Sequence, residues 1–224
     1  MAAILNIETS TTNCSVCLAK DGEPLVIKEQ DDVNYSHSEN LHVFIREVME
    51  QAAIPLPDID SIAVSMGPGS YTGLRIGVST AKGLCYSLDK PLIAIPTLQV
   101  LASVYTIESG VILPLLDARR MEVYSAVYDK DHQPVRETRA EIITGESFGE
   151  WLERGKVYFT GNGAEKCKGI ITHANAVFPE RIEAPSASGM AWLAEKKFKT
   201  GRFENVAYFE PYYLKDFVVT GKKK

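Results

Sequence analysis

The sequence predicts an α/β protein built from two similar lobes, and two observations lead to this fold class. The first is a strand–turn–strand–turn–strand pattern followed by amphipathic helices in the N-terminal half. The second is that this pattern recurs, because residues 112–134 can be laid over residues 4–24 with one gap. A duplicated unit of this kind predicts two α/β lobes with a cleft between them, where the hairpin turns of both copies face each other.

The first copy begins with short apolar runs that predict strands over 3–8, 14–19 and 24–28. The hydroxyl-rich turn from Thr9 to Asn13 either binds an anion or satisfies its own backbone, as Ser and Thr in turns commonly do. Ser36 and Glu39 form a capping box, which predicts an amphipathic helix over 36–53.

The stretch Ser61–Leu88 passes from a buried strand through a glycine-rich turn into a helix over 72–88. Gly73, Gly77 and Ala81 recur on one side of that helix. Each glycine costs about 1 kcal/mol of helix propensity, so this stripe predicts a close backbone contact. The turn lacks the residues of a P-loop, of a dinucleotide fingerprint and of a nucleophile elbow. A tight turn before a close-packed helix and a phosphate site both remain open.

A domain junction is expected near residues 108–110. The predicted lobes are therefore residues 1–108 and 109–224, with a C-terminal helix or tail that can pack back on the first lobe. The tail sequence EPYYLKD either docks on a partner or packs on a lobe. The remaining predicted elements are strands over 91–96, 112–117, 122–128 and 156–160, a strand from 134, and helices over 97–105, 164–173 and 186–201.

Composition narrows the functional class. The chain has 224 residues, 45% of them hydrophobic, and a net charge of −5, which disfavours a stand-alone nucleic-acid binder. No membrane span or cleavable leader is recognised, so a cytoplasmic protein is expected.

Cys14 and Cys17 would point to opposite faces of a strand, which favours reduced structural thiols. His37 and His42 are five residues apart, not the four that a shared helical metal site needs.

Together with the duplication, long motifs give the chain a family resemblance. It resembles the acetate kinase, Hsp70 and actin (ASKHA) superfamily, and more closely the TsaB (YeaZ) family of bacterial tRNA-modification subunits, paralogues of TsaD. This implies two tandem actin-like, ribonuclease H-like lobes with mixed sheets flanked by helices. The matching segments are IETS ending at Ser10, YSHSENL at 35–41, GPGSYTGLRIGVSTAKGL at 67–84, LDARRMEVY at 116–124 and PYYLKD at 211–216.

The resemblance implies a role in making threonylcarbamoyladenosine at position 37 of ANN-reading tRNAs. TsaD-like chains hold a metal through an HxxxH pair, whereas Thr97 and Leu101 stand at the matching places here. Neither side chain ligates a transition metal as imidazole does. The expectation is therefore a non-catalytic subunit, with no catalytic residue and no metal. It would bind and activate a TsaD-type transferase, alongside a TsaE-type ATPase, a second copy of itself, and tRNA only within the complex.

The resemblance also implies two sets of site residues. No tightly bound cofactor is expected, although ATP or ADP could lie at the interface with TsaD. The alternative is an ATP-binding kinase or ATPase of the same superfamily, with Glu8 or Asp117 as the base. The predicted partner or dimer interface consists of His37, Leu41, Phe44, Ile45, Val48, Gly73, Leu74, Gly77, Val78, Ala81 and Leu84. The predicted vestigial nucleotide or anion loops consist of Glu8, Thr9, Ser10, Gly67, Gly69, Ser70, Asp117, Arg119, Arg120, Gly161 and Gly163.

Overall fold

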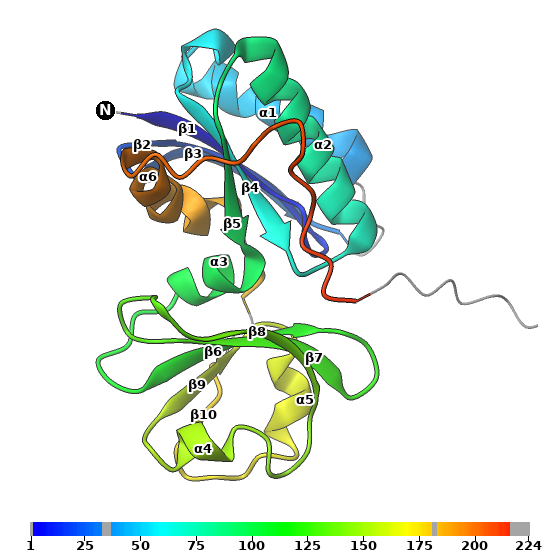
Figure 1. Cartoon of the computed structure of the whole chain (residues 1–224), viewed down its shortest axis with the longest axis vertical. Coiled ribbons are helices and arrows are strands. Elements are labelled where there is room, and N and C mark those ends of the chain that lie inside the picture. The colour runs from blue at the N-terminus through cyan, green and yellow to red at the C-terminus, as the bar shows by residue number, and fades with distance from the viewer. Residues whose placement is uncertain (1, 33–36, 181–182, 216–224) are drawn as a thin grey trace, which may run out of the picture.

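A computed structural model describes residues 2–32, 37–180 and 183–215 and shows two lobes, each built on a five-stranded mixed sheet (Figure 1). The first lobe comprises β1 (Ala3–Glu8), β2 (Asn13–Lys20), β3 (Glu23–Asp31), α1 (His37–Ala52), η1 (Leu56–Asp58), β4 (Ser61–Gly67), α2 (Tyr71–Leu88), β5 (Leu92–Pro96) and α3 (Thr97–Ser103). The second comprises β6 (Val111–Asp117), β7 (Glu122–Tyr128), β8 (Pro134–Ile142), α4 (Gly149–Leu152), β9 (Val157–Thr160), α5 (Ala164–Lys168) and β10 (Ala176–Val177).

The two sheets have the same topology, as the duplication predicts. Their orders are β3-β2-β1-β4-β5 and β8-β7-β6-β9-β10. In each sheet the first strand pairs antiparallel with the second and parallel with the fourth. The lobes differ in their helices, because α1 and α2 have 16 and 18 residues whereas their counterparts α4 and α5 have four and five.

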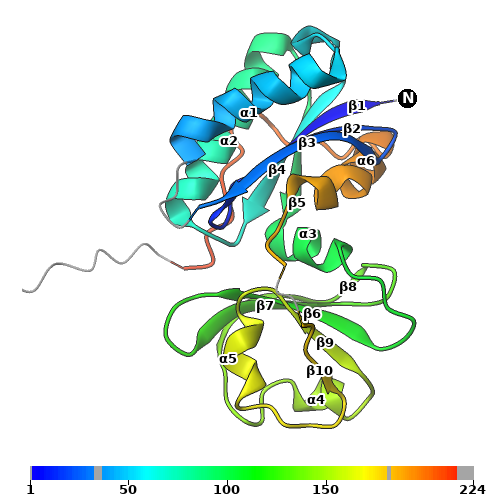
Figure 2. The same ribbon diagram turned by 180° about the vertical axis from the view of Figure 1, so that it is seen from behind.

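The strand β1 is the centre of the first lobe, since all six of its residues are buried. Leu5 and Ile7 join the core beneath α1 and α2, whereas Ile4 joins a second core. A strand covered on both faces reads as a continuous apolar run, which is why AILNIE lacks the polar alternation of a half-exposed strand. Figures 1 and 2 show α1 and α2 on one side of this sheet and α3 and the C-terminal helix α6 (Ala191–Lys199) on the other.

The C-terminal segment returns to the first lobe. After the short helix η2 (Ala187–Met190), α6 places Leu193 and Ala194 in the core that contains Ile4 and Ile93. Although α6 follows the second lobe in the sequence, it packs on the first. The return of a C-terminal helix to the first lobe is the arrangement that the sequence pattern left open.

The helix α3 lies between the two sheets (Figure 1). Its Leu98 and Leu101 join a core cluster with Ile112 and Leu116 of β6. The predicted helix over 97–105 is thus present but ends at Ser103.

Other differences are local. The predicted helix over 164–173 ends at Lys168, where Gly169, a poor helix former, takes the C-cap position. The third strand continues to Asp31, beyond the predicted 28. Ser36 of the predicted capping box lies outside the described residues. Among the described helices, none combines the length and apolar character that a bilayer crossing requires.

Candidate functional site

The glycine-rich turn before α2 is packed against the turn that follows β1. The backbone N–H of Ser70 donates to the carbonyl of Ser10 at 2.6 Å, and the Thr9 hydroxyl donates to the carbonyl of Gly73 at 2.8 Å. A Cβ atom added at Gly69 would overlap the Ser10 carbonyl oxygen. The two turns of the first lobe that were considered as anion sites therefore pack against each other, and Thr9 and Ser10 are buried.

This packing corrects the interpretation of the small-residue stripe on α2. A Cβ atom at Gly73 would overlap the carbonyl oxygen of Thr9, and one at Gly77 would overlap the Thr9 hydroxyl. Ala81 is fully buried in the first-lobe core. The close backbone contact exists as predicted, but its partner is the turn after β1 of the same chain rather than another chain.

Glu8, at the end of β1, is fully buried within this packed region. Its Oε1 accepts a hydrogen bond from the Ser10 N–H at 2.6 Å and another from the Ser65 hydroxyl at 3.0 Å. Its Oε2 has no hydrogen-bond partner among the described residues. Burial raises the pKa of this carboxyl, and the bonds from Ser10 and Ser65 offset only part of that rise. Because the Glu8 carboxyl is fully buried, it cannot contact a ligand in this conformation. The structure therefore does not support the alternative role of Glu8 as a kinase base.

The raised pKa of Glu8 predicts a pH-dependent stability. The folded state binds the proton more tightly than the unfolded state does. The resulting stabilisation is fully present below the ordinary pKa of 4.5 and is lost as pH rises through the folded-state pKa. Glu8→Gln should therefore raise the free energy of unfolding relative to the parent by more at about pH 8 than at about pH 5. Urea denaturation measures this, and a gain that does not grow with pH would contradict it.

In the second lobe, Asp117 organises the turn after β6. Its Oδ1 accepts from Lys166 Nζ and from the backbone N–H of Arg119, both at 2.6 Å. The backbone N–H of Asp117 donates to Asn162 Oδ1 at 2.9 Å. This carboxylate is thus engaged within its own lobe, and the turn Gly161–Gly163 lies beside it.

The tight turn Gly161–Gly163 repeats the packing of the first lobe. The N–H of Gly163 donates to the Leu115 carbonyl at 3.0 Å, and a Cβ at Gly161 would overlap that carbonyl and the side chain of Leu101. The structure therefore joins the predicted loop residues into two separate clusters. In the first lobe Ser10 meets Gly69 and Ser70, whereas Gly67 lies against the backbone of Tyr212. In the second lobe Asp117 bonds to Asn162 of the Gly161–Gly163 turn.

The cleft predicted between the lobes is a pocket of about 110 Å³. Small-molecule sites have about 300–1,000 Å³, so this one is small for a nucleotide. None of the predicted anion-loop residues lines it. The lining residues are Thr11, Thr12, Asp31, Asn162, Glu183, Ala184 and Pro185.

The places that match the histidine pair of TsaD-like chains are buried in the core. Thr97 and Leu101 are fully buried, and Leu101 packs beside Gly161. Among the described residues, no group of three or more His, Cys, Asp and Glu side chains lies close enough to hold a metal ion. The four cysteines are buried and unpaired, and burial raises the pKa of Cys14 to about 11 and those of Cys17, Cys85 and Cys167 to about 12, which makes them poor thiolate ligands at neutral pH.

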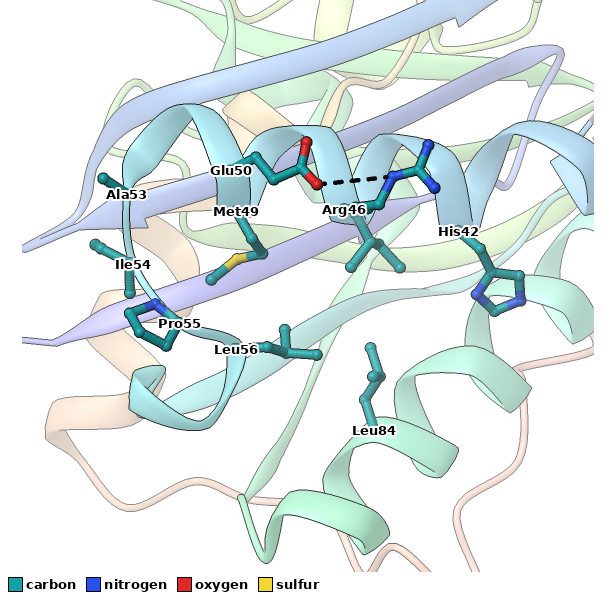
Figure 3. Close-up of a pocket in the computed structure, with 10 residues that line it drawn as sticks. His42, Arg46, Met49, Glu50, Ala53, Ile54, Pro55, Leu56 and Leu84 are labelled. Atoms are coloured by element: carbon teal, nitrogen blue, oxygen red, sulfur yellow. Dashed lines mark ion pairs between the residues drawn. The ribbon is translucent and has the colours of Figure 1, made fainter.

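A larger hollow than the inter-lobe pocket lies on the helical face of the first lobe (Figure 3). It is an open groove of about 580 Å³ between the C-terminal half of α1, the loop that follows it and Leu84 of α2. Arg46 and Glu50 pair at its rim, with 3.9 Å between Nε and Oε1. The lining residues are His42, Ile45, Arg46, Met49, Glu50, Ala53, Ile54, Pro55, Leu56 and Leu84.

Comparison with known proteins identifies the family. The profile described as "TsaD: tRNA N6-adenosine threonylcarbamoyltransferase" matches residues 31–222. The Escherichia coli tRNA threonylcarbamoyladenosine biosynthesis protein TsaB is 30% identical over 98% of this chain and 97% of its own length. The chain belongs to the TsaB family. The Bacillus subtilis TsaB protein is 34% identical over 75% of this chain and 74% of its own length.

The TsaB assignment agrees with the fold. The solved structure of YeaZ from Pseudomonas aeruginosa superposes with a TM-score of 0.82 at 25% identity and covers 96% of this chain and 100% of that one. A second solved Pseudomonas aeruginosa chain, described as similar to peptidase YeaZ, gives a TM-score of 0.83 at 24% identity. The predicted actin-like, two-lobed architecture of the ASKHA superfamily is thereby confirmed.

In this TsaB-family chain, most of the residues predicted for an interface lie inside the lobe. Only Ile45 and Leu84 line the groove, and Phe44 is half-buried against the core. The apolar residues that follow the helix, Ile54 and Leu56, were not among the predicted residues. Both are half-buried against the core, and their position on either side of Pro55, just after the helix, is the sequence signal that could have indicated them. The predicted interface residues that are buried in the lobe are His37, Leu41, Val48, Gly73, Leu74, Gly77, Val78 and Ala81.

Proposed function

We propose that this chain is a non-catalytic subunit of tRNA threonylcarbamoyladenosine biosynthesis, which binds and activates a TsaD-type transferase. The observation that carries the proposal is the apolar groove beside α1 and α2, in a chain whose relatives are named for this pathway. The proposal also includes a TsaE-type ATPase and tRNA as partners within the complex. ATP or ADP would lie between subunits.

The groove has the properties of a protein-docking surface. It is open rather than enclosed, and Met49, Ile54 and Leu56 give it an apolar floor. An apolar hollow rimmed by charged residues such as Arg46 and Glu50 is typical of a site for an amphipathic helix. Because this surface remains uncovered in the single chain, a partner that covers it gains apolar burial at about 25 cal/mol per Å².

The likeness between this chain and TsaD supports a transferase of that type as the occupant. The TsaD family profile matches from residue 31 to 222 and so spans α1, the groove and α2. Related chains present related surfaces, and two such surfaces can pack about a pseudo-two-fold axis. A second copy of this chain would then compete with the transferase for the same groove.

The non-catalytic role is supported by the surroundings of the candidate catalytic and metal-binding residues. Glu8 is fully buried, and Asp117 forms an ion pair with Lys166. By the sequence resemblance, Thr97 and Leu101 occupy the positions of the histidine pair that holds the metal in TsaD-like chains. In the described arrangement Glu8 does not reach a substrate, and neither Thr97 nor Leu101 offers the imidazole that would hold a metal.

Co-expression with the TsaD-type paralogue of the same organism tests this function. The two chains should co-purify, and threonylcarbamoyl transfer to tRNA by the paralogue should depend on this chain, whereas this chain alone should transfer nothing. Transfer by the isolated chain would contradict the non-catalytic role. Full activity of the paralogue without this chain would contradict the proposed activation.

A further inference from the structure

The C-terminal tail forms a strap, residues 203–215, that runs along α2 toward the second lobe (Figure 1). The N–H of Glu204 donates to the Leu92 carbonyl at 2.9 Å, which covers the edge strand β5. Further along, Lys82 Nζ donates to the Phe209 carbonyl at 2.8 Å, and the N–H of Tyr212 donates to the Met66 carbonyl at 2.7 Å. The strap is therefore fixed by hydrogen bonds at three points.

Near its end the strap builds an exposed aromatic stack with the first turns of α2. The Arg75 guanidinium lies 4.0 Å from the centre of the Tyr71 ring, and the rings of Tyr71 and Tyr213 are 5.1 Å apart. Arg75 Nε donates to the Tyr213 hydroxyl at 3.2 Å. Tyr212 and Tyr213 remain 44% and 37% exposed, so both residues are partly accessible to solvent beside the Arg75 cation.

Two residues further, the strap reaches the second lobe. Lys215 forms an ion pair with Glu122 at the start of β7 and lies 5.8 Å from the centre of the Tyr124 ring. This contact places the end of the strap beside the β6–β7 turn, where Arg119 and Arg120 are both exposed. The aromatic stack and the arginine turn are thereby joined on one side of the molecule.

The charge of this surface is positive. The two carboxylates beside the arginine turn are both paired, Asp117 with Lys166 and Glu122 with Lys215. The strap adds one exposed carboxylate, Glu210, against the cations Arg75, Arg119 and Arg120. In the described ranges, neither Arg119 nor Arg120 has a carboxylate within ion-pair distance. A local excess of cations on a chain of net charge −5 is a specific feature and does not follow from the average composition.

We propose that this surface binds tRNA directly, with the arginine turn on the phosphates and the strap tyrosines against an unpaired base. We name it the basic aromatic surface, and it consists of Tyr71, Arg75, Arg119, Arg120, Tyr212, Tyr213 and Lys215. The inference rests on the proposed function for the identity of the RNA. Cations that track a backbone beside rings that stack bases are the two components of single-strand recognition. An acidic protein segment would be attracted by the arginines, but its carboxylates would not stack on the partly exposed tyrosine rings.

The double variant Arg119→Gln/Arg120→Gln tests the phosphate contacts. The probe is a fluorescein-labelled anticodon stem-loop of an ANN-reading tRNA, titrated by fluorescence anisotropy with the full chain and with its TsaD complex. Loss of two phosphate contacts on a single strand should reduce the slope of log K against log salt by about 1.4 between about 50 and about 200 mM salt. Tyr213→Ala should weaken binding roughly 5- to 160-fold by removing one stacked base.

The matched control is Lys130→Gln/Arg139→Gln, which removes the same charge from two exposed positions, one in the β7–β8 turn and one opposite Ser125 in the middle of β7. It should keep the parental salt slope. A parental slope in the Arg119→Gln/Arg120→Gln variant would overturn the proposal, as would loss of TsaE-type ATPase binding with unchanged RNA affinity, which would make this surface a protein interface. Co-purification with TsaD reports on the groove, so failure of the proposed function is seen separately.

Discussion

Gly73→Ala is expected to destabilise the protein by about 2–3 kcal/mol, because the added methyl group overlaps the backbone carbonyl of Thr9. That carbonyl belongs to the turn between β1 and β2, which cannot retreat without breaking the Ser70–Ser10 hydrogen bond of 2.6 Å. Urea denaturation followed by circular dichroism measures the loss.

Gly83→Ala provides the control within the same helix. Gly83 is exposed, and an added Cβ has no atom within 4 Å. The higher helix propensity of alanine should therefore stabilise the protein by up to about 1 kcal/mol. Equal effects of the two substitutions would contradict the close packing of Gly73. A stable Gly73→Ala protein that fails to bind its partner would favour an intermolecular contact at the stripe after all.

Leu84→Asp is expected to weaken binding of the TsaD-type partner by roughly 30-fold or more, since a charge in the middle of an apolar interface costs at least about 2 kcal/mol. Leu84 lines the groove from the α2 side, opposite Leu56 and Ile54 (Figure 3). Calorimetric titration with the purified paralogue measures the change. Threonylcarbamoyl transfer by the proposed complex should fall in parallel when this chain is limiting.

Leu25→Asp is the matched control for this prediction. Leu25 lies on the edge strand β3 of the same lobe, is 51% exposed and does not line the groove. It should bind the partner as the parent does. If both aspartate variants bind normally, the groove is not the docking surface. If Leu84→Asp also lowers the thermal stability of the free chain, its binding loss must be compared at a temperature where both variants are folded.

Much of the fold could be predicted from local patterns. The run AILNIE predicted β1 with its observed bounds, and the spacing of apolar residues after Ser70 predicted α2 to within one residue. The repeated strand pattern predicted two lobes, and the common strand order of both sheets agrees with it. Such features depend on periodicity and turn residues within about 20 positions, which a single sequence displays directly.

The candidate site was harder to predict because it depends on contacts between distant segments. The stripe of Gly73 and Gly77 correctly indicated a close approach, but nothing in the spacing identifies Thr9, 64 positions from Gly73, as the neighbour. Similarly, Ser and Thr in the turn after β1 left open an anion site and a turn that satisfies its own backbone, whereas the structure packs that turn against the glycine-rich segment. Helix periodicity also does not tell a face that meets the sheet from one that meets another chain, which is why Leu41 and Val48 were predicted for an interface.

The position of α3 has a mechanical consequence. The apolar side chains of α3 form one core cluster with Ile112 and Leu116 of the second sheet. A rotation of one lobe relative to the other would therefore have to separate close-packed buried side chains. We therefore expect the two lobes to keep a fixed relative orientation when another protein binds to the chain.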